Sequence, residues 1–232
     1  MSDDAAEIAR LLAAPEPITW VFAGDSITQG ASHTLGWRDY TELFGERVRF
    51  EMSRRSDVVI KTAVSGWRIQ DVDASVKRTL LQWRPNVVSL AVGMNDCVAG
   101  ESGLAAFQAT YEAVIARVRG EVAAAVIMHT PPRILPLDEP RWSNLPAYVQ
   151  AVRDVSRATN AVLVDHHAHW TTAVDVDALP YWLSDAIHPN EHGHRAMSHL
   201  VFKRLGMWDG ASPVCRLFVP RIVVDESSTN EC

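Results

Sequence analysis

The stretch ITWVFAGDSIT, residues 18–28, passes from an apolar run directly into a polar turn. ITWVFA (18–23) has the composition of a buried strand, and GDSIT (24–28) follows it without a linker. In one interpretation Gly24 supplies backbone freedom and Asp25 or Ser26 caps the next helix. In the other, Ser26 is a nucleophile at the carboxyl end of a strand, which requires a base, an orienting acid and oxyanion donors elsewhere.

Apolar runs alternate with amphipathic stretches along the whole chain. This alternation is typical of β-α units, and it predicts a parallel sheet covered by helices on both faces. The predicted strands are 18–23, 57–64, 86–92, 121–128 and 161–165, and the predicted helices lie near 39–46, 69–83, 103–119, 145–159 and 190–205. The segment 131–146 holds five prolines, so we predict a loop there, at the end of a strand.

The length of 232 residues fits one large α/β domain. We place that domain at residues 1–205 and interpret 206–232 as a C-terminal tail, because the β-α alternation stops there. Within the tail, 217–224 is apolar enough to pack on the body, whereas 225–232 is a polar end. Nothing in the sequence indicates an oligomeric state.

Composition excludes several classes of protein. A net charge of −6 argues against nucleic acid as the main partner and against anionic membrane surfaces. Apolar stretches are too short for a membrane span, and the first residues have no signal-peptide pattern, so we expect a cytoplasmic protein. Three widely spaced cysteines give neither a disulfide framework nor a zinc motif.

Three consecutive strand ends carry residues suited to acyl transfer. Ser26 follows the first strand, Gly66 lies in VSGWR (64–68) after the second, and Asn95 lies in GMND (93–96) after the third. The backbone N–H groups of Ser26 and Gly66 and the side-chain amide of Asn95 would give three donors for an oxyanion. Glycine suits the second position because no side chain blocks the approach of substrate.

His188 is the best candidate for the base among nine histidines. It lies in a loop ahead of the last predicted helix, with Asp185 three residues before it. A carboxylate there can accept the imidazole Nδ1–H and leave Nε2 free to take the serine proton. Pro189 keeps His188 out of the helical region, so both groups stand on one stiff loop.

These blocks resemble those of the SGNH, or GDSL-type, hydrolase superfamily. GDSIT, Gly66, GMND and DAIH follow one another in the family's order from residue 24 to 188, about three quarters of the chain. Many members have Asn beside the glycine of the second block, whereas Ser65 and Trp67 flank Gly66 here.

The resemblance implies an α/β, flavodoxin-like fold of three layers with a five-stranded parallel sheet. It also implies a serine esterase or acyl hydrolase that uses no metal and no cofactor. Carried over by position, Ser26 is the nucleophile, His188 the base and Asp185 its orienting acid, with Gly66 and Asn95 completing the oxyanion hole.

Competing roles exist for several polar residues. The histidine clusters at 166–169 and 188–194 are alternatives as metal sites, although neither has a complete zinc spacing and Pro189 interrupts the second. Asp165, which ends the fifth predicted strand, is the rival of Asp185 as the acid. Asp25 and Asp96 are interpreted as acceptors that shape their loops.

Three tryptophans are predicted to rim the site. Trp37, Trp67 and Trp182 fall in or near loops at the carboxyl edge of the sheet, where aromatic faces suit sugar rings or apolar acyl chains. A packing role is the alternative for each of them.

We therefore expect a serine esterase that forms an acyl-serine intermediate on a small-molecule ester. The favoured substrate carries a short, acetyl-like group on a carbohydrate or small hydroxylated scaffold. The alternatives are a lysophospholipase, thioesterase or acyltransferase with the same residues, a metallohydrolase, and a carbohydrate-binding protein that has lost catalysis.

Overall fold

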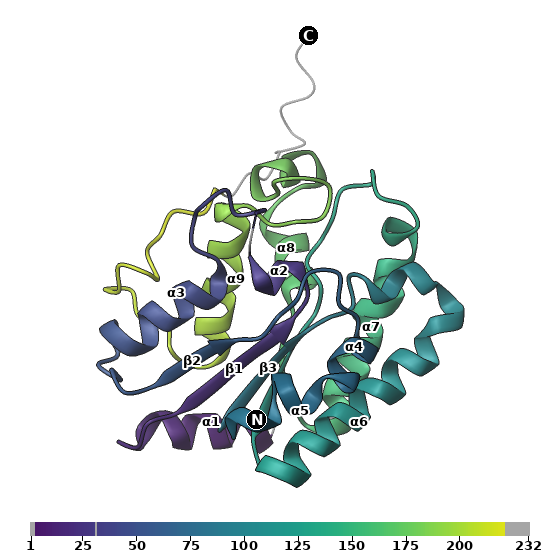
Figure 1. The fold of residues 1–232 in the computed structure, drawn as a ribbon. Helices are drawn as coiled ribbons and strands as arrows, with labels where there is room; N and C mark the ends of the chain where they lie inside the picture. The colour runs from purple at the N-terminus through teal and green to yellow at the C-terminus, as the bar shows by residue number, and fades with distance from the viewer. Residues whose placement is uncertain (1–2, 31, 221–232) are drawn as a thin grey trace.

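The computed structural model describes residues 3–30 and 32–220, and it contains one parallel five-stranded sheet (Figure 1). The strand order is β2-β1-β3-β4-β5, which is the flavodoxin-like order. The strands are β1 (Thr19–Gly24), β2 (Val58–Lys61), β3 (Val87–Ala91), β4 (Ala125–His129) and β5 (Val162–Val164). The predicted three-layer α/β/α fold is confirmed.

Helices cover both faces of this sheet. On one face α3 (Tyr40–Glu46) packs against α9 (Glu191–Arg204), and on the other α6 (Leu104–Val122) packs against α4 (Ile69–Ala74) and α7 (Arg141–Thr159) (Figure 1). The remaining helices are α1 (Asp3–Ala13), α2 (Ser26–Gln29), α5 (Val76–Thr79) and α8 (His166–Ala173). Shorter helical turns are the π-helical η1 (Arg47–Glu51) and the 3-10 turns η2 (Leu81–Trp83), η3 (Asp96–Ala99), η4 (Glu101–Gly103) and η5 (Val176–Trp182).

The central strands are buried on both faces, as their continuous apolar sequences require. Val87, Val88 and Leu90 of β3 are at most 1% exposed. The register pairs Gly24 with Ala91, so β1 and β3 end at the same level. The loops that follow these two strands therefore emerge side by side.

Four helical segments differ from the prediction. Helix α1 was not predicted, although Ile8 is buried and Asp4 accepts from Arg119 at 2.6 Å. The predicted helix 69–83 is broken at Ser75, whose φ and ψ of −106° and 6° are not helical. The histidine cluster 166–169 opens α8, a helix that was likewise not predicted.

Helix α7 begins at Arg141, inside the segment predicted to be a loop. Pro146 is the sixth residue of this helix, so it removes only one early backbone hydrogen bond. Burial of Leu145 at 2% exposure and hydrogen bonds from Ser143 to Glu139 favour the helical start. The prediction of a loop over 141–146 is therefore wrong.

The described part of the predicted tail lies on the body. Met207 and Val214 are buried, and Arg47 donates from Nε to the Met207 carbonyl at 3.0 Å. Glu51 accepts from the Val214 amide at 3.0 Å. Residues 221–232, which include half of 217–224 and the whole polar end, lie outside the described residues, and the boundary at 205 and 206 stays a prediction.

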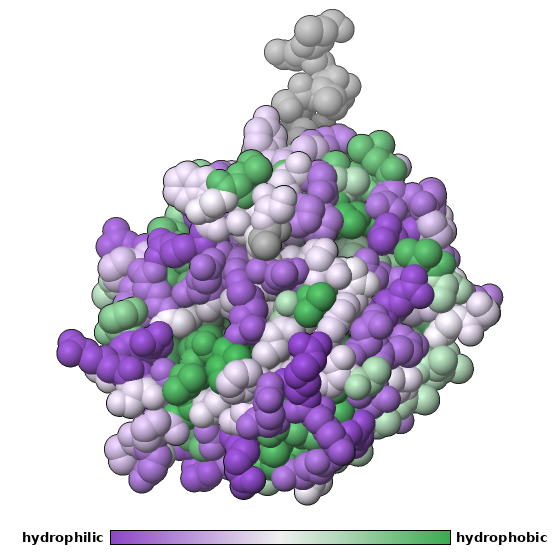
Figure 2. All heavy atoms as spheres, in the orientation of Figure 1, coloured by the Kyte–Doolittle hydropathy of each residue, from purple (hydrophilic) through white to green (hydrophobic). Residues whose placement is uncertain are grey.

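The surface in Figure 2 is largely hydrophilic, with hydrophobic residues in separate small patches. Within residues 3–30 and 32–220, no helix combines the length and the apolar character that crossing a membrane would require.

Candidate active site

Helix α2 follows β1 after one residue (Figure 1), and Ser26 is the first residue of this helix. Asp25 caps this short helix, because its Oδ1 accepts from the Ile27 amide at 3.0 Å. Gly24 allows the turn to press against β3: a Cβ there would lie 2.5 Å from the Ala91 carbonyl oxygen and 2.7 Å from Thr28 Oγ1. Both interpretations of GDSIT are thus compatible, since the cap of α2 is Asp25 and Ser26 presents its hydroxyl.

His188 and Asp185 reach Ser26 from the loop between η5 and α9. His188 Nε2 lies 2.9 Å from Ser26 Oγ, and His188 Nδ1 lies 2.7 Å from Asp185 Oδ2. Asp185 Oδ1 also accepts from the backbone amides of Ile187 and His188, each at 2.8 Å. The loop therefore holds the carboxylate and the imidazole in one local unit, as the sequence predicted.

The hydrogen bonds determine where the proton lies. A carboxylate only accepts, so the imidazole proton is on Nδ1, and Nε2 is left to accept from the Ser26 hydroxyl. Burial lowers the pKa of His188 below its ordinary value, and Asp185 partly offsets that shift. Burial would raise the pKa of Asp185, but hydrogen bonds from Ile187 and His188 hold it below its ordinary value. At neutral pH the serine faces a neutral base and an ionised carboxylate.

The predicted oxyanion donors lie in the segments that follow β1, β2 and β3. Gly66 has a φ of +81°, a conformation that favours glycine, and a Cβ added there would meet no protein atom within 4 Å. Asn95 donates from Nδ2 to the Trp67 carbonyl at 3.1 Å, which ties the loop after β3 to the loop after β2. Ser26 opens α2, so its N–H has no acceptor within the helix.

Two buried acids support the loops, as predicted. Asp96 Oδ1 accepts from the Ile69 amide at 2.9 Å, and Asp25 caps α2. Burial raises the pKa of Asp25 to about 7 and that of Asp96 to about 6. Both side chains are nearly inaccessible, so they shape the site without facing its opening.

His33 is a site residue that the sequence analysis missed. Its ring stacks on His188 with centroids 3.4 Å apart and an interplanar angle of 3°, and its Nδ1 lies 3.4 Å from Asp185 Oδ2. Within the described residues, His33, Asp185 and His188 are the one group whose ligand atoms are close enough to share a metal ion. An ion binds imidazole nitrogen in the ring plane, and two parallel rings do not share a plane, so the observed geometry is that of a stack.

Arg141 was also missed, because an arginine inside a proline-rich segment carries no motif. Its Nη2 lies 3.4 Å from Asn95 Oδ1, which places a guanidinium against the side chain of Asn95.

The rival groups lie elsewhere. Asp165 accepts from Arg153 Nε at 2.7 Å and caps α8 through the Ala168 amide. His166 is fully buried and bonds to His129, with 2.9 Å between His166 Nε2 and His129 Nδ1. In the second predicted cluster His188 is engaged by Ser26 and Asp185, as described above.

The three predicted aromatic residues have different positions. Trp37 is 56% exposed, and Trp67 is partly buried on the loop that contains Gly66. The predicted position of Trp182 at the rim is wrong, because its side chain is 1% exposed. Trp182 packs edge-on against Trp170 with centroids 5.0 Å apart, since Leu179 and Trp182 of η5 turn inward.

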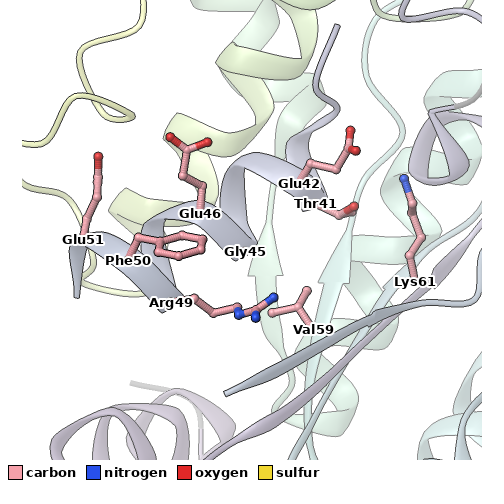
Figure 3. Close-up of a pocket in the computed structure, with 9 residues that line it drawn as sticks. All are labelled: Thr41, Glu42, Gly45, Glu46, Arg49, Phe50, Glu51, Val59 and Lys61. Carbon is pink, nitrogen blue, oxygen red and sulfur yellow. The ribbon is translucent and has the colours of Figure 1, made fainter. Parts of the chain in front are cut away.

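A separate groove of about 670 Å³ lies between α3 with η1 and the edge strand β2 (Figure 3). Figure 3 shows Phe50 and Arg49 on one side and Val59 and Lys61 on the other. None of the predicted catalytic and oxyanion residues lines this groove; these are Ser26, Gly66, Asn95, Asp185 and His188.

A parallel α/β sheet that presents a serine, a histidine and an aspartate in a hydrogen-bonded chain is typical of a serine hydrolase. The match to a family model is more specific. Residues 22–196 match the GDSL-like Lipase/Acylhydrolase family, so the chain belongs to that family and is a serine esterase of the SGNH type.

Relatives agree with this assignment. An acetylxylan esterase of Geobacillus stearothermophilus is 23% identical over 209 residues, covering 80% of this chain and 93% of the relative. A catalytic-mutant crystal structure of that esterase matches with a TM-score of 0.68 at 19% identity, covering 82% of this chain and 94% of that one. A putative GDSL-like lipase of Parabacteroides merdae matches with a TM-score of 0.72 at 16% identity over 83% and 97% of the two chains. These structures share the fold.

Proposed function

We propose that the chain hydrolyses short acyl esters, acetyl-like groups above all, on a carbohydrate or another small hydroxylated scaffold. The observation that carries the proposal is the hydrogen-bonded chain from Asp185 through His188 to Ser26, next to Gly66 and Asn95. In the acetylxylan esterase, variants of a serine, an aspartate and a histidine are described as catalytic mutants, and the last two residues are three positions apart, as Asp185 and His188 are.

The geometry supports a two-step reaction. Ser26 Oγ attacks the ester carbonyl while His188 Nε2 takes its proton, and Asp185 stabilises the imidazolium. The Ser26 and Gly66 amides and Asn95 Nδ2 stabilise the oxyanion. His188 then protonates the leaving alcohol, and water that His188 activates releases the acyl group from Ser26.

A short acyl group is supported by the similarity of the chain to the acetylxylan esterase of Geobacillus stearothermophilus. Trp37 and Trp67 are the proposed contacts for the scaffold, because they remain accessible beside the loops of the site. Three expectations stay predictions: the cytoplasmic location, the boundary between the domain (1–205) and the tail (206–232), and the absence of a nucleic-acid partner.

The test is hydrolysis of p-nitrophenyl esters from acetyl to dodecanoyl by the wild type and by Ser26→Ala, with and without a chelator. We expect activity that depends on Ser26, falls steeply with chain length and is unaffected by the chelator. Acetylated sugars then form the second panel. A preference for long chains would support the lysophospholipase or thioesterase alternative, and acceleration by added alcohol acceptors would support an acyltransferase.

A further inference from the structure

Arg141 holds the turn that follows β3 through two consecutive residues. Its Nε donates to the Met94 carbonyl at 3.2 Å, and its Nη2 donates to Asn95 Oδ1 at 3.4 Å. The guanidinium is therefore bonded both to the backbone that carries Asn95 and to the side chain of Asn95.

These bonds determine how the Asn95 amide is turned. A guanidinium only donates and a backbone carbonyl only accepts, so Oδ1 must face Arg141 and Nδ2 must face Trp67. If the amide were rotated by half a turn, Nδ2 would face the guanidinium of Arg141, donor against donor. Oδ1 would then face the Trp67 carbonyl, acceptor against acceptor. Nδ2 gives one hydrogen to Trp67 and keeps its second hydrogen for another acceptor.

Asp138 in turn holds Arg141. Arg141 Nη1 donates to Asp138 Oδ1 at 2.9 Å and to Oδ2 at 3.1 Å, and both side chains are 23% exposed. The carboxylate balances the charge of the guanidinium, so Arg141 is poorly suited to attract an anionic substrate. It is well suited to transmit a fixed orientation from the start of α7 to Asn95.

We propose that Arg141 is a positioning residue that holds the Asn95 amide in the one orientation that directs its second N–H at the oxyanion. The inference rests on the proposed function, because it assigns a role to Asn95 in the same reaction. It gives the proline-rich segment a role in the site: the segment delivers Asp138 and Arg141 behind the oxyanion donors.

The test is a double-mutant cycle between Arg141→Gln and Asn95→Ala, followed by kcat and KM on p-nitrophenyl acetate. Loss of the Asn95 amide should lower kcat about 10²- to 10³-fold. Arg141→Gln should lower kcat about tenfold, which lies within the range of interaction energies between residues in contact, and should change KM less than about twofold. In the Asn95→Ala background, Arg141→Gln should have almost no further effect, because the amide that it orients is absent.

Two further variants separate geometry from charge and from folding. Arg141→Lys keeps the charge but cannot make the forked bonds, so its kcat should lie below that of the wild type. Asp138→Asn should show a smaller loss that also disappears in the Asn95→Ala background, and it keeps the test open if Arg141→Gln does not fold. Arg153→Gln is the matched control, because Arg153 is on the same helix but bonds to Asp165, and it should keep full kcat.

Three results would each overturn the inference. The first is a double variant whose loss of kcat equals the product of the two single losses. The others are an Arg141→Gln variant with a higher KM at unchanged kcat, and an Arg141→Lys variant with full kcat. The Ser26→Ala variant is measured in the same series. If it retains activity, the proposed function itself is wrong, which is a different result from failure of the cycle.

Discussion

Among residues 3–30 and 32–220, two serines are hydrogen-bonded to a histidine at similar distances, and the shorter pair does not contain the candidate nucleophile. Ser26 Oγ lies 2.9 Å from His188 Nε2, whereas Ser89 Oγ lies 2.7 Å from His129 Nε2. Ser89 is in the middle of β3 and His129 is at the end of β4, so this second pair lies inside the sheet layer.

The pairs differ in their third partner and in accessibility. His188 donates to the carboxylate of Asp185, whereas His129 Nδ1 is bonded to the imidazole of His166. Burial lowers the pKa of His129 to about 3, so it cannot hold a proton taken from a serine. The distance between a serine and a histidine is therefore a poor criterion for catalysis. A catalytic pair also needs a carboxylate partner for the histidine and access for the substrate.

The largest expected effect comes from removing one serine of each pair. Ser26→Ala should lower kcat by about 10⁴-fold or more, because the acyl-enzyme cannot form. Ser89→Ala should keep kcat within about threefold but lose about 1–3 kcal/mol of stability, because His129 loses a buried hydrogen bond. Ester hydrolysis and urea unfolding measure the two effects.

A fluorophosphonate probe sharpens the same comparison. It should label the wild type and Ser89→Ala but not Ser26→Ala. Labelling of Ser89 would show that the buried pair is accessible and would remove the distinction between the pairs.

The second effect concerns the partner that distinguishes the pairs. Asp185→Asn should lower kcat about 10²- to 10⁴-fold, because an amide neither fixes the tautomer of His188 nor stabilises its charged form. Asp185 raises the pKa of His188, so in the variant the acidic limb of the kcat/KM profile should move to lower pH. A profile with an unchanged acidic limb would contradict the assigned role of Asp185.

The sequence predicted the parts of this site that lie in local units. Asp185 and His188 share one loop, and Ser26, Gly66 and Asn95 follow successive parallel strands, whose ends meet at one edge of the sheet by topology. Strand positions followed from apolar runs, except that Glu121 and Val122, the first residues of the predicted strand 121–128, belong to α6.

The contacts that His33 and Arg141 make with the site were not predicted. His33 meets His188 through a stack between two loops, and Arg141 meets Asn95 from a helix whose start the prolines disguised. Trp182 was misplaced because a polar, loop-like neighbourhood does not reveal which face of η5 turns inward. Such contacts depend on how elements pack, which periodicity does not specify.

A smaller effect is expected for the stability of the buried pair in acid. The folded-state pKa of His129 is about 3, below the ordinary value near 6.5, so the unfolded chain binds the proton first. Its contribution to stability should therefore be present above about pH 6.5 and decline as pH falls toward 3. Asp25 titrates in the opposite sense, because burial raises its pKa to about 7 and protonation there favours the folded state.

Comparing the wild type with His129→Asn cancels the contribution of Asp25. The variant should be less stable at pH 7, and the difference in unfolding free energy should shrink by about 2 kcal/mol between pH 7 and pH 5. Urea unfolding at both pH values measures it. A difference that stays constant would show that His129 is not held neutral in the fold.

The smallest effect concerns the ring that stacks on His188. His33→Ala should lower kcat/KM about 2- to 10-fold, because the catalytic imidazole loses a stacked partner. His33→Phe keeps a ring in place and should lose less. Because His33 acts to lower the pKa of His188, the acidic limb of the profile should move to higher pH in both variants. Equal losses without that movement would mean that His33 only fills space beside the triad. The movement would show that the Ser26–His188 pair, unlike the Ser89–His129 pair, is tuned by a second histidine.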